Sequence, residues 1–159
     1  MSQGTARSAA HAALSSRQFA TFHVDRLFFG LEVLEVQEVL RYQEMTRVPL
    51  APPVIRGLIN LRGQIVTAID MRERLSLPPR EEGTFPMNMV VRTDDGPVSL
   101  LVDEIGDVLA VSPEAYEAPP GNMRGEERRM IEGVYKLDGR LLLVLDRDKV
   151  LQVQVENQA

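Results

Sequence analysis

Two aspartates, Asp70 and Asp146, come closest in type and spacing to a catalytic pair in this chain. Aspartic proteases bring one carboxylate from each of two similar halves into a shared dyad that works as general acid and base. Those enzymes carry Asp-Thr-Gly or Asp-Ser-Gly, whereas Asp70 is followed by Met and Arg, and Asp146 by Arg and Asp. A hydrolase would need both carboxylates in one cleft. Each aspartate also stands where an N-cap would begin a helix, so capping is the stronger prediction.

The other residue types exclude most kinds of active site. The chain has 159 residues and no cysteine, which excludes disulfides, thiolate metal sites and cysteine nucleophiles. His11 lies in a low-complexity segment and His23 in an expected strand, so neither a histidine metal site nor a Ser-His-Asp triad has its parts. Ser15, Ser16 and Thr67 have no nearby base. The chain is therefore short of the residue types that catalysis uses, and we expect no metal or cofactor.

The charge balance argues against nucleic acid as a partner. The chain has 18 Lys and Arg against 23 Asp and Glu, a net charge of −5, and no basic run. Phosphate binding needs clustered cations, and base stacking needs an aromatic surface. With only five Phe and three Tyr, the chain offers no evident stacking surface. An RNA-binding small barrel is therefore a remote alternative.

The segments that carry the two aspartates are copies of one unit. Residues 57–70 align with residues 133–146 at a constant offset of 76, with identical Gly, Leu, Gly and Asp. Residues 31–40 align with residues 100–109 at an offset of 69. A unit of about 65 residues is near the lower size limit for a core of its own, so we expect the two copies to share one.

Each copy is predicted to consist mainly of short strands separated by turn signals such as Asp138-Gly139. The expected strands are Phe19–Val24, Leu27–Val33, Met87–Thr93, Val98–Val102, Ile131–Leu137 and Arg140–Asp146. The run Leu141–Leu145 is apolar at every position and must be covered on both faces. Closing each sheet removes its edges, so the predicted architecture is all-β with a few short helices, in two interlocked β-barrels.

Three helical pieces are also expected. Asp70 and Asp146 would cap helices over Met71–Leu77 and Arg147–Val153, with Glu73 completing a capping box after Asp70. A third stretch has the spacing of one apolar helix face, for which packing in the core is the commoner outcome. Its apolar positions are Val33, Val36, Val39 and Leu40.

Composition and patterning also predict the domain limits. Residues 1–17 are expected to be a flexible tail, residues 18–152 one folded domain, and residues 153–159 a second tail. Within the domain the first copy covers residues 18–79 and the second residues 87–152. The chain lacks the apolar stretch of a signal peptide or membrane span, so a cytoplasmic protein without direct membrane insertion is expected.

Arg62 is the strongest candidate for a binding residue. Arg62 and Gly63 occupy the hairpin position that Asp138 and Gly139 hold in the second copy, so Arg62 should lie at an exposed turn. Core packing explains a guanidinium at the tip of an apolar strand pair poorly, and arginine is well suited to interface carboxylates. On pattern alone, a binding residue and a solvated turn residue are equally good interpretations.

The stretch from Gly57 to Arg72, with Asn-Leu-Arg-Gly in it and Val-Pro and Ala-Pro before it, resembles the CheW family of chemotaxis coupling proteins. Residues 101–109 resemble a second recurrent stretch of that family, and residues 139–146 its ending. The resemblance runs from Phe19 to Leu151 and so covers nearly everything except the expected tails.

This resemblance implies two intertwined SH3-like five-stranded β-barrels and a function without catalysis. It implies an adaptor between the cytoplasmic tip of methyl-accepting chemoreceptors and the regulatory domain of a CheA-type histidine kinase. Such an adaptor is recruited to membrane-associated receptor arrays, where other CheW-like subunits are further candidate partners in array rings. An adaptor of a non-flagellar chemosensory pathway, for surface motility or another output, fits the same residues.

The resemblance also implies two sets of site residues. The receptor-facing set is Arg62, Glu38, Gly57 and Val108. The kinase-facing set is Val33, Val36, Val39 and Leu40. We further predict an ion pair between Glu38 and Arg62, because each charge would otherwise be desolvated alone when a partner binds.

Overall fold

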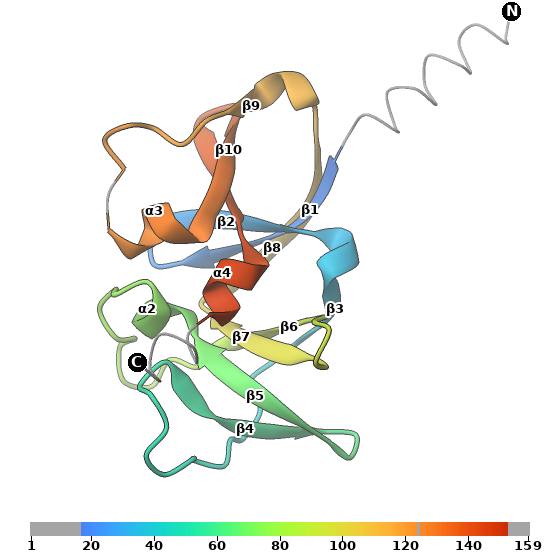
Figure 1. The fold of residues 1–159 in the computed structure, drawn as a ribbon, viewed down its shortest axis with the longest axis vertical. Coiled ribbons are helices and arrows are strands. Elements are labelled where there is room, and N and C mark those ends of the chain that lie inside the picture. Colours follow the sequence, from blue (N-terminus) through green and yellow to red (C-terminus); the bar gives the residue numbers. More distant parts are fainter. Residues whose placement is uncertain (1–16, 124, 153–159) are drawn as a thin grey trace, which may run out of the picture.

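The structure is a computed structural model that describes residues 17–123 and 125–152, which form two β-sheets with short helices between them (Figure 1). The tails predicted over residues 1–17 and 153–159 lie outside the described residues, with one exception. Arg17 begins the first strand and is not part of a tail. Its guanidinium forms ion pairs with Glu32 at 2.7 Å and Glu132 at 3.1 Å, which hold it on the folded domain.

The first sheet has six strands in the order β8-β1-β2-β11-β10-β9, and the second has five in the order β3-β6-β7-β5-β4. Strands of the first sheet are β8 (Glu104–Val111), β1 (Arg17–Val24), β2 (Leu27–Glu32), β11 (Arg140–Leu145), β10 (Ile131–Leu137) and β9 (Tyr116–Glu117). Strands of the second sheet are β3 (Val36–Leu40), β6 (Met87–Val91), β7 (Val98–Val102), β5 (Gln64–Asp70) and β4 (Ile55–Leu61). The six strands expected from the sequence are all present, with ends that differ by at most two residues.

Both sheets mix strands from the two copies of the repeat. The first sheet joins β1 and β2 of the first copy to β10 and β11 of the second, and the second sheet joins β4 and β5 to β6 and β7. The joints are equivalent parallel pairs, Thr67 beside Val98 and Leu143 beside Phe29. The predicted interlocking is confirmed, because neither sheet is made from one copy alone.

Each sheet closes on itself through a contact between its edges. The segment after β3 pairs with β4 on the opposite edge, where Thr46 and Leu58 exchange two backbone hydrogen bonds of 2.8 Å. The segment after β8 makes the equivalent contact in the other sheet, where Glu117 of β9 pairs with Val134 of β10. Two small barrels result, and closure protects edge strands that would otherwise be free.

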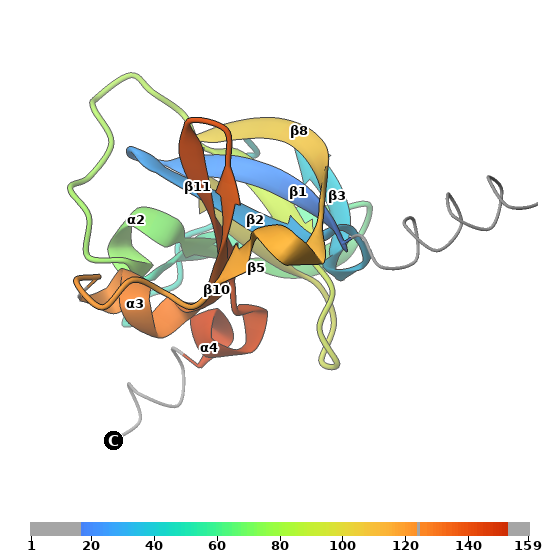
Figure 2. The same cartoon turned by 90° about the horizontal axis from the view of Figure 1, so that it is seen from above.

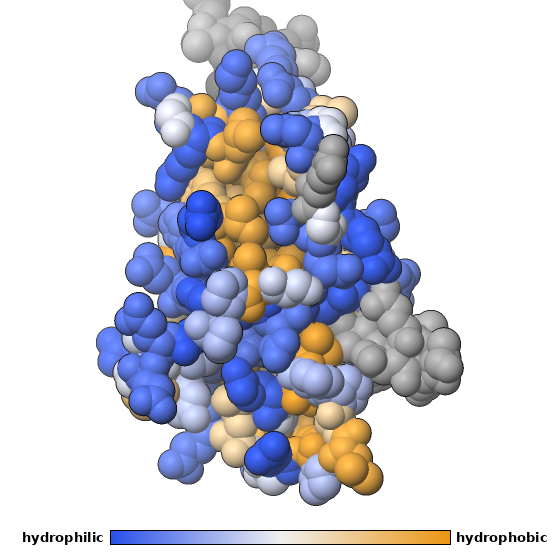
Figure 3. Space-filling model, turned by 90° about the vertical axis from the view of Figure 1, so that its left-hand side faces the viewer, coloured by the Kyte–Doolittle hydropathy of each residue, from blue (hydrophilic) through white to orange (hydrophobic). Residues whose placement is uncertain are grey.

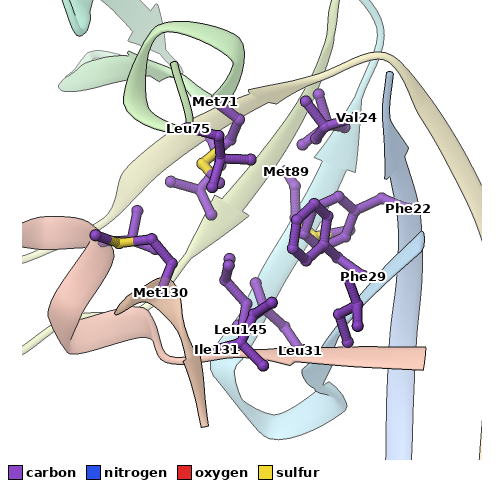
Figure 4. Packing of buried hydrophobic residues seen from close by; sticks show 14 of the residues in the cluster. Phe22, Val24, Phe29, Leu31, Met71, Leu75, Met89, Met130, Ile131 and Leu145 are labelled. Carbon is purple, nitrogen blue, oxygen red and sulfur yellow. The ribbon is translucent and has the colours of Figure 1, made fainter. Parts of the chain in front are cut away.

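One hydrophobic cluster fills the space between the barrels and draws on both copies (Figure 4). Phe22 and Phe29 stack within it with ring centroids 5.6 Å apart. Met71 and Leu75 reach it from the first copy, and Met130 reaches it from the second. The expectation of a shared core is confirmed, since neither copy could bury these side chains by itself.

Three short helices, α2 (Met71–Arg74), α3 (Glu126–Met130) and α4 (Arg147–Leu151), gather beside the sheets in both ribbon views (Figures 1 and 2). The predicted capping roles are confirmed, because Asp70 accepts a hydrogen bond from Arg72 N at 3.0 Å and Asp146 accepts one from Lys149 N at 3.2 Å. The capping box predicted with Glu73 is wrong. The backbone N–H of Asp70 donates instead to Val54 O, 2.7 Å away.

The third predicted helix is wrong. Val33 lies in a 3-10 turn, η1 (Val33–Glu35), and the other three apolar positions lie on β3. There Val36 pairs with Val91 of β6, and Val39 pairs with Met89. Valine suits a strand better than a helix, and pairing with β6 outweighs the helical spacing.

Candidate partner-binding surface

A tight turn between β4 and β5 holds Arg62 in the solvent. Arg62 has φ 51° and Gly63 has φ 87°, and two positive values are what a type I′ hairpin turn requires. The side chain of Asn60 fixes this turn, because its Oδ1 accepts a hydrogen bond from Gly63 N at 2.8 Å. The Asn-Leu-Arg-Gly sequence thus forms the turn and leaves the Arg62 side chain 73% exposed.

Arg62 forms a bidentate ion pair with Glu38 of β3. Nη1 of Arg62 donates to Oε2 of Glu38 at 2.8 Å, and Nη2 donates to Oε1 at 2.6 Å. These hydrogen bonds lower the pKa of Glu38 and raise the pKa of Arg62. The predicted ion pair is confirmed, and it ties the β4–β5 hairpin to the opposite edge of the sheet.

Gly57 lies on the same barrel but is buried. A Cβ atom there would be 2.7 Å from the carbonyl oxygen of Thr46 and 3.0 Å from Cβ of Met45. Only glycine therefore lets β4 approach the closing segment. Gly57 therefore contributes to the shape of this barrel, because it allows this close approach. It has no side chain that could contact a partner.

Val108 lies on β8, at an edge of the other sheet, so it shares no sheet with Arg62 and Glu38. Its side chain is 60% exposed. At the offset of 69, Val108 is the repeat equivalent of Val39, which is 40% exposed on the edge strand β3. Each barrel therefore presents one exposed valine at an equivalent edge position.

The four residues predicted to face a kinase differ in exposure. Val36 packs against the shared core, and Leu40 packs against the smaller cluster inside the second barrel. Val33 is half-buried. Val39 alone of the four is exposed, so it offers the most side-chain surface to a partner.

A network of charges around the buried Asp70 joins the two copies. Asp70, which is 1% exposed, accepts hydrogen bonds from Arg56 at 2.6 Å and Arg80 at 3.1 Å. Arg80 also approaches Asp103 of the second copy, with Nε 2.9 Å from Oδ1, and Arg72 donates to Asp103 at 2.7 Å. The alternation of Arg and Asp compensates each buried charge, as a buried ion must be.

The structure lowers the pKa of Asp103, which belongs to this network. Burial alone would raise its pKa, but hydrogen bonds from Arg72 and from the backbone N–H of Asp25, with the charge of Arg80, outweigh burial and lower it. The same contact raises the pKa of Arg72. The carboxylate therefore stays ionised and holds the linker residue Arg80 in place.

The acid-base dyad considered for Asp70 and Asp146 finds no support. Their helices are neighbours, because the Arg74 guanidinium donates to Val150 O and Lys149 O at the end of α4. Each carboxylate nevertheless caps its own helix, and Asp70 is further occupied by two guanidinium groups. Among residues 17–123 and 125–152 there is no hydrogen bond between the two aspartates.

A sequence model described as the CheW-like domain matches residues 18–155 of this chain. The chain belongs to the CheW family. It is 31% identical over 145 residues to the chemotaxis protein CheW of Bacillus subtilis, across 91% of this chain and 93% of the relative. It is 28% identical over 140 residues to the chemotaxis protein CheW of Thermotoga maritima, across 88% of this chain and 91% of the relative.

The fold agrees with a solved CheW structure. The crystal structure of the scaffolding protein TtCheW from Thermoanaerobacter tengcongensis superposes with a TM-score of 0.75 at 25% identity, covering 82% of this chain and 89% of TtCheW. The family and the two SH3-like barrels expected from the sequence are therefore confirmed. In the part of the CheW-family chain that the structure describes, no helix has the length and apolar character needed to cross a bilayer.

Sequence reasoning missed most of the large hydrophobic side chains on the surface of this CheW-family protein. Figure 3 shows apolar groups collected in a stripe and at one edge of a face that is otherwise hydrophilic. The exposed large hydrophobic residues are Leu34, Val39, Tyr42, Leu50, Ile65, Phe85, Val108, Tyr116 and Leu141. The sequence could have indicated Leu50, because it follows Pro49 in a turn sequence. Large apolar residues are uncommon at such positions.

Proposed function

We propose that this CheW-family chain is a noncatalytic adaptor that couples methyl-accepting chemoreceptors to a CheA-type histidine kinase in chemosensory signalling. The observation that carries the proposal is the family match, which spans the described fold except for Arg17. Coupling requires only that one body bind two partners and transmit a bias between them. The adaptor would be recruited to membrane-associated receptor arrays, with other CheW-like subunits as neighbours.

The receptor side of this proposal centres on Arg62. Its guanidinium is held by Glu38 in a fixed orientation, while most of the side chain faces the solvent. Arg62 can therefore bind a carboxylate or carbonyl on a receptor without first ordering a long flexible side chain. This lowers the entropy cost of binding. Gly57 supports this surface, and Val108 would add an apolar contact from the other barrel.

The kinase side rests on the β3 strand and its surroundings. Val39 would be buried directly by the kinase regulatory domain, and Val33, Val36 and Leu40 would hold the strand that presents it. Burial of one such side chain contributes about 1.5–3 kcal/mol, so a moderate interface needs only a few.

Separate and combined binding measurements test the proposal. The purified chain would be titrated with a CheA regulatory domain, with a receptor cytoplasmic fragment, and with one in the presence of the other. We expect binding to each, and a receptor-dependent change in kinase affinity that is matched by the reciprocal change. Binding to neither partner would contradict the proposal.

A further inference from the structure

Leu50 combines two features that the fold does not require. It is fully exposed, and its backbone has φ 65°. The turn runs from Val48 to Ala51, is closed by a hydrogen bond of 3.3 Å from Ala51 N to Val48 O, and has Pro49 as its second residue. Proline followed by a residue of positive φ is the type II pattern, in which the third position normally holds Gly or Asn. Leucine there costs backbone strain and exposes apolar surface.

The loop around Leu50 is rigid. Pro49 fixes one side of the turn, and Pro52 begins a second turn in which Ile55 N donates to Pro52 O at 2.9 Å. The backbone of Leu50 is therefore restrained, while its side chain lies in the solvent. A restrained backbone lowers the entropy cost when a partner buries the side chain.

The charges beside Leu50 indicate the character of a partner. Arg47, Arg56 and Glu73 line the same hollow of about 750 Å³ as Leu50, so basic side chains outnumber the acidic one there. Arg56 is paired with Asp70, whereas Arg47 is exposed and forms no ion pair with any described residue. A matching surface would offer an apolar pocket with a carboxylate at its rim.

The position of the loop separates it from the Arg62 ion pair. Figure 1 shows the β3–β4 connection at the start of β4 and the β4–β5 hairpin at its far end. The seven residues of β4, Ile55–Leu61, span about 20 Å. An adaptor that holds two partners at once needs separate faces for them, and the two ends of β4 provide these.

We propose that Leu50 is an anchor residue that inserts into an apolar, acid-rimmed pocket on the kinase regulatory domain. The inference rests on the proposed adaptor function and assigns a second contact to its kinase side. Strain and exposure at Leu50 then have a physical reason, since residues that break local rules of folding are expected at functional sites.

Substitution by asparagine separates binding from folding. Asparagine accepts positive φ, so Leu50→Asn should raise the melting temperature by about 2–4 °C while weakening binding to the CheA regulatory domain about 10- to 100-fold. Leu50→Met keeps an apolar tip and should retain most of the binding. Ser76→Asn is the matched control, because Ser76 is exposed with φ 57° and the change should leave kinase binding unaltered.

Each outcome has a distinct meaning. If wild-type protein binds the regulatory domain and Leu50→Asn binds it equally well, the anchor role is overturned while the adaptor function stands. If Leu50→Asn loses receptor binding and keeps kinase binding, the assignment to the kinase is overturned. If wild-type protein binds neither partner, the adaptor function itself fails.

Discussion

The guanidinium of Arg62 donates two hydrogen bonds of 2.8 and 2.6 Å to the carboxylate of Glu38, although the two residues are 24 positions apart in the chain. The contact forms because the β4–β5 hairpin folds across the barrel to the edge strand β3. It leaves the Arg62 side chain 73% exposed while two hydrogen bonds hold its guanidinium. The two residues therefore act as one surface feature.

The first prediction concerns this ion pair. Arg62→Asp should weaken binding to a receptor cytoplasmic fragment about 10-fold or more, because it removes an oriented cation and places two carboxylates together. The melting temperature should change little, since Arg62 is mostly exposed. Arg26→Asp makes the same charge change at another hairpin tip and should bind normally. Equal receptor binding by both variants would remove Arg62 from the receptor site.

Gly57 provides a test of shape without charge. Gly57→Ala should lower the free energy of unfolding by about 1–3 kcal/mol, because the new methyl group meets the backbone carbonyl of Thr46. Gly121→Ala is the control, since nothing lies within 4 Å of a Cβ there. Chemical denaturation measures the free energy of unfolding of both variants. If Gly57→Ala is as stable as wild type, the segment around Thr46 can move away from β4 at little cost.

The charge network around Asp70 predicts a pH dependence. The folded pKa of Asp103 lies below its ordinary value of 3.8, so its ionised form stabilises the protein above that pH, and this contribution is lost as the pH falls through the folded pKa. Asp103→Asn should cost about 1–3 kcal/mol at pH 7, because Arg72 and Arg80 lose their shared partner.

Denaturation of both proteins from pH 7 down to pH 3 gives the readout. The difference in free energy of unfolding between wild type and Asp103→Asn should become smaller as the pH approaches 3. If this difference in free energy of unfolding stays the same at every pH, the ionisation of Asp103 contributes nothing to stability. The conservative change Asp138→Asn, at an exposed hairpin turn, should leave stability at pH 7 unchanged.

Val36 and Val39 lie on one strand, but substitution of Val36 should affect stability and substitution of Val39 should affect binding. Val36→Ala should destabilise the fold by about 1–2 kcal/mol, because Val36 packs against the shared core. Val39→Lys should leave the fold intact and weaken binding to the kinase regulatory domain, because Val39 is exposed on the edge strand. Unaltered kinase binding by a folded Val39→Lys variant would count against β3 as the kinase surface.

The sequence predicts those parts of the fold that depend on short-range chemistry. The hairpin turns at Arg62-Gly63 and Asp138-Gly139 follow from the positive φ that glycine adopts there, and Asp70 and Asp146 are caps because their side chains reach the first turn of a helix. The repeat also predicts that the two copies interlock, since each is too small to bury its own apolar face.

The errors arise where long-range pairing decides the structure. Valines spaced like a helix face form β3 because β6 lies beside them, and that pairing joins residues about 50 positions apart. The network of Arg56, Asp70, Arg80 and Asp103 likewise depends on the parallel pairing of β5 with β7. No local pattern encodes these contacts. The local sequence also does not predict how exposed each side chain is. It therefore could not distinguish the exposed Val39 from the packed Val36.

The most direct test of adaptor function is recruitment of kinase to receptor by this chain. Receptor cytoplasmic assemblies would be sedimented with a fixed amount of CheA regulatory domain and increasing amounts of the purified protein. We predict that the kinase domain moves into the pellet in proportion to the added protein until it saturates, and that about 10-fold or more of the Arg62→Asp variant is needed for the same transfer. Kinase that stays in the supernatant at every concentration of wild-type protein would contradict the adaptor function.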